Sequence, residues 1–113
     1  MDNREQGRRY EVFAAKYLCS RGYQIIAQNF HCRQGEVDVI AKDGRYLVFV
    51  EVKYRKNLEA GFPAEAVDRK KQQKIRQAAR YYLYRNHYGE EVPCRFDMVS
   101  IVGEKISLIQ DAF

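Results

Sequence analysis

The chain has 113 residues, of which 46% are hydrophobic and 31% are charged, and these values predict one globular domain over residues 1–113. No apolar run approaches the roughly 20 residues that span a bilayer, and the first residues are charged where a signal peptide is apolar. We therefore expect a cytoplasmic protein with no membrane contact, and the net charge of +5 favours a polyanionic partner.

The N-terminal part of the chain predicts a helix and then a strand. Apolar residues recur at helical spacing over residues 5–21, and Gly22 can end the helix in the left-handed conformation. The buried stripe of this helix is expected to contain Tyr10, Phe13, Ala14, Tyr17 and Leu18. Residues 23–30 predict a strand, and 31–34 predict a polar loop in which His31 is not a ligand.

A β-hairpin is predicted over residues 35–54. The pair Asp43-Gly44 separates two runs rich in β-branched and aromatic residues, which is typical of a tight hairpin turn. Side chains alternate along a strand. One face of the first strand should therefore carry Glu36, Asp38 and Ile40, and the other Val37, Val39 and Ala41. One face of the second strand should carry Leu47, Phe49, Glu51 and Lys53.

The charges on the second strand of this hairpin need an explanation. The run over residues 47–52 is largely apolar on both faces, as in a central strand that is covered on both sides. The strand nevertheless carries two opposite charges, Glu51 and Lys53. The two residues could form a structural ion pair. Alternatively, hairpin pairing brings Asp38 beside Glu51, and two carboxylates held together repel each other unless a cation joins them.

The second half of the chain predicts a long helix over residues 64–87, opened by Pro63. Segment 63–88 has five more cationic than acidic residues, and helical spacing puts Lys71 inside its apolar stripe. There Lys71 either snorkels to the edge of the sheet or points toward the carboxylates. The opposite, solvent side of the helix should carry Arg69, Arg76 and Arg80.

Two further strands are expected over residues 95–102 and 105–110, joined by a turn at Gly103-Glu104. The order of elements then predicts an α/β fold, with a central mixed sheet flanked by helices. A structural role is expected for Asp97, paired with Arg95 or a helix lysine. The three cysteines are far apart in the sequence, so we expect free thiols.

The acidic and basic residues of the hairpin carry a resemblance to a known family. Asp38, followed downstream by Glu51-Val52-Lys53, resembles the D-(x)n-E-x-K signature of restriction-endonuclease-like nucleases. Over residues 7–113 the chain is similar to the bacterial YraN family, whose members are regarded as relatives of archaeal Holliday-junction resolvases. The segments that carry this wider similarity are Gly35-Glu36-Val37-Asp38, Phe49-Val50-Glu51-Val52-Lys53-Tyr54-Arg55, Ala64-Glu65-Ala66-Val67 and Arg95-Phe96-Asp97.

The resemblance implies a restriction-endonuclease-like fold and a site that binds Mg²⁺ or Mn²⁺. Its metal ligands would be Asp38, Glu51, the carbonyl of Val52 and, from the first helix, Glu11. Periodicity alone would make Glu11 a solvated residue at the edge of the apolar stripe. Catalysis would rest on Asp38, Glu51 and Lys53, with Lys53 positioning or activating the attacking water.

Nucleic-acid backbone phosphates would be bound by Arg55, Lys71 and Lys74. Glu36 stands either as an auxiliary ligand or as a flanking charge. The resemblance and the small size also predict a homodimer. These implications favour a metal-dependent endonuclease that acts on DNA rather than RNA, including branched or junction DNA. The alternatives are a non-catalytic nucleic-acid-binding module with a nuclease-like fold, and an accessory protein whose basic helix docks on an acidic partner.

Overall fold

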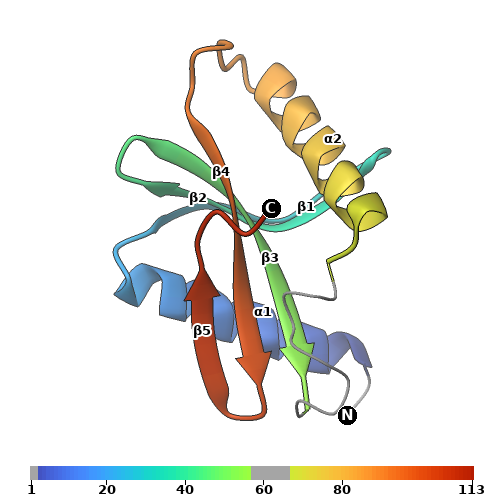
Figure 1. Cartoon of the computed structure of the whole chain (residues 1–113), viewed down its shortest axis with the longest axis vertical. Coiled ribbons are helices and arrows are strands. Elements are labelled where there is room, and N and C mark those ends of the chain that lie inside the picture. The colour runs from blue at the N-terminus through green and yellow to red at the C-terminus, as the bar shows by residue number, and fades with distance from the viewer. Residues whose placement is uncertain (1–2, 57–66) are drawn as a thin grey trace.

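Five strands form one sheet in the order β1-β2-β3-β4-β5 in the computed structural model, which describes residues 3–56 and 67–113 (Figure 1). The elements are α1 (Asn3–Ser20), β1 (Gln24–Cys32), β2 (Gly35–Asp43), β3 (Tyr46–Arg55), α2 (Arg69–Arg85), β4 (Cys94–Val102) and β5 (Lys105–Ile109). The pair β3–β4 is parallel and the other pairs are antiparallel. The predicted mixed α/β sheet is therefore confirmed.

The two helices cover opposite faces of this sheet (Figure 1). The core beneath α2 contains the helix residues Ile75, Ala78, Ala79 and Tyr82 together with Ile40, Leu47 and Phe49 of the strands. The core beneath α1 contains Ala14 and Leu18 together with Val39, Val48, Val50 and Val99. Because β3 contributes to both cores, its apolar run over residues 47–50 is explained by burial on both faces.

Helix α1 differs from its prediction at one position of the apolar stripe. Ala14 and Leu18 are buried as expected, but Phe13 is 49% exposed. The helix packs on the sheet with a narrower face than the sequence periodicity suggests, so Phe13 lies beyond the contact. Gly22 has a φ of +91° and follows the helix, and the N–H of Tyr23 donates to the carbonyl of Leu18. The predicted left-handed end is therefore confirmed.

The start of α2 also differs from the prediction. Asp68 precedes the first helical residue, and its carboxylate accepts a hydrogen bond from the backbone N–H of Lys71. Such an N-cap satisfies a helix donor that would otherwise lack a partner, so the helix begins at Arg69 and Val67 lies before it. The predicted start at 63–66 lies outside the described residues.

The predicted loop at 31–34 is wrong, because β1 continues to Cys32 and β2 already begins at Gly35. Only the two turn residues at 33–34 separate the strands, and His31 pairs directly with Glu36. The polar sequence concealed this strand end because its side chains are exposed or half-buried. The predicted turns at Asp43-Gly44 and Gly103-Glu104 are confirmed.

Arg76 is not a free charge on the solvent side of α2. Its guanidinium lies over the ring of Phe96 at 4.6 Å and near the ring of Phe113 at 5.7 Å. The C-terminal residues return to the α2 side of the sheet and half-bury this arginine. The cysteines are free, as predicted. No helix among the described residues is both long and apolar enough to span a bilayer.

Candidate active site

The candidate site lies where the pairing of β2 with β3 ends. The ladder runs from Asp43 opposite Tyr46 to Val39 opposite Val50. Beyond it, the carboxylate of Asp38 accepts a hydrogen bond from the backbone N–H of Val52 at 2.8 Å. A side chain thus replaces the backbone partner that a regular ladder would supply, and this bond fixes the Asp38 carboxylate against β3.

The backbone is irregular around Asp38. The register of β1 and β2 places Asn29 opposite Asp38, and Asn29 has a φ of 54°, which is uncommon for a residue other than glycine. Val37 packs with Ile40 beneath α2, whereas Val39 packs beneath α1. The prediction that Val37 shares a face with Val39 is therefore wrong, because the two side chains lie in cores on opposite faces of the sheet.

Glu51 brings the second carboxylate to this place from β3. The residue is 6% exposed and follows Leu47 and Phe49 on the α2 side of the strand. The Nζ atom of Lys71 on α2 lies 3.7 Å from its Oε1. Of the two interpretations of Lys71, the one in which it points toward the carboxylates is therefore confirmed.

The surroundings raise the pKa of both carboxyl groups. Burial raises the pKa of Asp38 to about 6, and the charges of Glu11 and Glu36 add to this increase. Burial, together with the charge of Asp38, raises the pKa of Glu51 to about 7. The Val52 N–H and the charge of Lys71 act in the opposite direction on Asp38. Two such groups are ionised together at low cost only when a cation is present.

The remaining predicted ligands lie around this pair at longer range. Glu11 is half-buried on α1, close enough for its charge to act on Asp38. Glu36 acts electrostatically on both Asp38 and Glu51, and its carboxylate is 3.1 Å from the imidazole Nδ1 of His31. The charge of Lys53 lowers the pKa of Glu51. Charged residues of α1, β2, β3 and α2 thus act electrostatically on the two carboxyl groups.

This donor set suits a hard cation that keeps part of its water shell. Within 3–56 and 67–113, no three acidic, histidine or cysteine side chains gather as a ready-made metal site. Mg²⁺, however, is commonly held by one or two carboxylates and several waters. Asp38, Glu51 and the carbonyl of Val52 fit that requirement through their oxygen chemistry, and the raised pKa values of the two acids favour a positive partner.

The predicted phosphate-binding residues are distributed unequally. Lys71 and the exposed Lys74 line one cleft beside the turn between β1 and β2. Arg55 lies at the end of β3, where its carbonyl accepts a hydrogen bond from the N–H of Gly103. Its buried Nε has no hydrogen-bond partner within the described part of the chain. Arg55 is therefore placed beyond Lys53 on the strand, but no contact joins it to the carboxylates.

A second buried polar cluster lies beneath the α1 side of the sheet. Asp97 is fully buried and accepts hydrogen bonds from Arg95 and from the hydroxyl of Tyr23 at 2.6 Å. Arg95 also contacts Asp43 at 2.7 Å. The predicted pairing of Asp97 with Arg95 is confirmed, but no sequence pattern indicated the bond from Tyr23. This cluster is internally satisfied and acts as a structural joint.

One residue near the site was missed. His31 was predicted to be an uninvolved loop residue, yet it pairs with Glu36 and lines the same cleft as Lys71. The pairing follows from the length of the turn, because a hairpin with two turn residues at 33–34 places His31 opposite Glu36.

The fold and the site together define an α/β protein with a mixed sheet between two helices, an architecture consistent with the restriction-endonuclease-like fold. The family model described as "Uncharacterised protein family UPF0102", which is the YraN family, matches residues 10–101. The chain belongs to this family, so the resemblance noted in the sequence is confirmed at that level.

Relatives of similar length support this assignment. The chain is 50% identical over 113 residues to a UPF0102 protein of Lachnoclostridium phytofermentans, covering 100% of this chain and 96% of the relative. It is 44% identical over 109 residues to one of Saccharophagus degradans, covering 96% and 92%. It is 42% identical over 119 residues to one of Caldicellulosiruptor bescii, covering 100% of both.

Proposed function

We propose that the protein is a Mg²⁺- or Mn²⁺-dependent endonuclease that hydrolyses phosphodiester bonds in DNA, including branched or junction DNA. The observation that carries this proposal is the pair Asp38 and Glu51. Glu51 is buried, Asp38 is half-buried, and both carboxyl groups have raised pKa values. Natural proteins rarely bury two acids together without a functional use for their charge.

The ion would be held by Asp38, Glu51 and the carbonyl of Val52, with Glu11 supporting it and Glu36 as an auxiliary group. When bound, such an ion stabilises charge on a phosphate and lowers the pKa of an attacking water. The hydrogen bond from Val52 orients Asp38 before the ion arrives. Lys53, near enough to act on the charge of Glu51, would orient the water or neutralise the developing charge.

The substrate backbone would be bound by Lys71, Lys74 and Arg55. Contacts of this kind supply affinity without sequence information, so we infer recognition of nucleic-acid shape rather than of a base sequence. We also infer a homodimer, because a chain of 113 residues covers little of a duplex alone.

One observation favours a different function. The Nζ of Lys71 is 3.7 Å from Glu51, so a side-chain cation already compensates part of the acidic charge. A non-catalytic nucleic-acid-binding module could use this ion pair to hold α2 against the sheet. In that case Asp38 would affect stability and leave nucleic-acid affinity unchanged.

Cleavage of labelled DNA distinguishes the two functions. Single-stranded, duplex, flapped and four-way-junction DNA would be incubated with Mg²⁺ or Mn²⁺ and with wild type, Asp38→Asn or Lys53→Ala. The exposed Glu104 provides a control, since Glu104→Gln removes a charge at the β4–β5 turn. A nuclease loses at least about a hundredfold in rate in both site variants and keeps its rate in the control. Absence of cation-dependent products from wild type on every substrate would refute the nuclease.

A further inference from the structure

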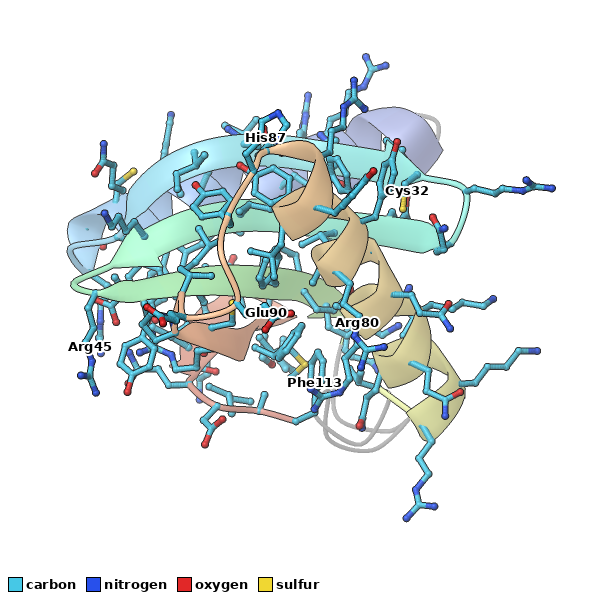
Figure 2. The ribbon with its side chains drawn as sticks, turned by 90° about the horizontal axis from the view of Figure 1, so that it is seen from above. Cys32, Arg45, Arg80, His87, Glu90 and Phe113 are labelled. Atoms are coloured by element: carbon cyan, nitrogen blue, oxygen red, sulfur yellow. The ribbon has the colours of Figure 1, made fainter. Side chains whose placement is uncertain are left out.

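A cleft of about 360 Å³ adjoins the candidate active site. Its walls come from the end of the β1–β2 hairpin, with His31, Cys32 and Glu36, and from α2, with Lys71, Lys74 and Ile75. Figure 2 shows Cys32 near the end of the hairpin, beside α2. Lys71 belongs both to this cleft and to the ion pair with Glu51, so a ligand in the cleft would lie beside the cation that contacts Glu51.

The lining of the cleft combines three kinds of chemistry. Lys71 and Lys74 are cations on one wall, suited to a phosphate. The buried Ile75 and the half-buried Cys32 form apolar surface. His31 offers an imidazole ring on which a base can stack, and its contact with Glu36 at 3.1 Å holds an acceptor beside that ring. A nucleotide has the matching groups, namely a phosphate, an aromatic face and amino donors on the base.

The size of the cleft limits what it can admit. Its volume lies near the lower end of the range for small-ligand pockets, about 300–1,000 Å³. The two walls meet closely at Gly35, because a Cβ added there would lie only 2.9 Å from the backbone carbonyl oxygen of Lys74. A base that is paired and stacked within a duplex must leave its stack before it can enter such a space.

We propose that this cleft receives one unpaired nucleotide next to the phosphate presented to Asp38 and Glu51. The protein would then prefer single-stranded or locally unpaired nucleic acid over a continuous duplex, since a paired base must leave its stack to enter. This inference rests on the proposed function for the identity of the neighbouring site. It adds the class of substrate and assigns His31 and Cys32 to its binding.

Binding can be measured without turnover, which separates this inference from the nuclease itself. Fluorescence anisotropy in the presence of a chelator would compare a labelled single strand with a duplex of the same sequence. We expect at least about tenfold tighter binding of the single strand. We also expect the double variant His31→Ala/Lys74→Ala to lose about five- to tenfold of that affinity, by loss of a stacking and a phosphate contact. Equal affinity for both forms, or an unchanged variant, would overturn the proposal whether or not DNA is cleaved.

Two controls make the assay specific to the cleft. Arg80→Ala removes a cation from α2 on the other side of the helix from Cys32 (Figure 2), and it should leave the single-strand preference unchanged. Cys32 serves as a native reporter, since a strand with a disulfide-activated thiol tether on one base can exchange with its thiol. Cross-linking to Cys32 but not to the exposed Cys19 is expected with the single strand. Labelling of Cys19 alone would place the nucleotide elsewhere.

Discussion

Asp38 and Glu51 make the free energy of unfolding depend on pH in an unusual direction. Their folded pKa values are about 6 and about 7, above the ordinary values of 3.8 and 4.5. A group with a raised folded pKa contributes stability that is present below its unfolded pKa and is lost as pH rises through its folded pKa. Without a divalent cation, the protein should therefore lose stability between about pH 4 and pH 7 through these groups.

Thermal unfolding in a chelator tests this expectation. The Tm of wild type should fall as pH rises from about 5 to 7.5. At pH 7.5, Asp38→Asn should have a higher Tm than wild type, and its free energy of unfolding should be higher by on the order of 1 kcal/mol. Addition of Mg²⁺ should raise the Tm of wild type more than that of the variant. If the Tm of the two proteins changed with pH in parallel, ionisation of Asp38 would not destabilise the folded state, which would contradict the expectation.

Lys71 carries a separate prediction for nucleic-acid binding. Lys71→Ala removes a cation that lies 3.7 Å from Glu51 and lines the cleft, so affinity for DNA should fall at low salt. Each lost phosphate contact should also make the plot of log affinity against log salt less steep, by about 0.9 for duplex and 0.7 for single strands. An equal change in Arg80→Ala, measured in the same titration, would show that only net charge matters.

At the scale of elements, the joint between β4, the β2–β3 hairpin and the start of β1 depends on Arg95. This side chain donates hydrogen bonds to the fully buried Asp97 and to Asp43. Arg95→Ala leaves a buried carboxylate without its cation, which should cost about 3 kcal/mol or more. Urea unfolding measures this loss. Arg45→Ala, at the exposed turn, should change stability by less than about 0.5 kcal/mol, and a loss comparable to that of Arg95→Ala would contradict the account.

The sequence predicted those elements whose signals are local. The Asp43-Gly44 turn and Gly22 mark features that involve a few neighbouring residues, and both are confirmed. The helix start and the end of β1 were wrong, because one depends on a cap by Asp68 and the other on pairing between exposed strands. Local patterns do not report such partners.

The same distinction applies to the candidate site. Hairpin pairing predicted that Asp38 lies beside Glu51. Helical spacing placed Lys71 in the apolar stripe of its helix but left two orientations open, and the contact with Glu51 decides between them. The pairing of His31 with Glu36 required the correct turn length, and the bond from Tyr23 to Asp97 joins residues far apart in the chain. Val37 and Val39 lie in different cores, although the alternation of residues within β2 predicts that they share a face.

For the whole molecule, the proposed homodimer has a direct test. Light scattering coupled to size-exclusion chromatography should give twice the chain mass of 13.4 kDa at micromolar concentration. A dimer is expected because so small a domain offers few contacts to a branched substrate. A mass of one chain, both alone and with DNA present, would contradict this expectation.

Asp38 and Glu51 are proposed to hold one divalent cation together. Calorimetric titration with Mn²⁺ near pH 6.5, in two buffers of different ionisation enthalpy, measures this binding, because the raised pKa values require it to release protons. We expect saturable binding with net proton release in wild type, and loss of both in Asp38→Asn. No binding by wild type, or binding and proton release unchanged in the variant, would contradict it.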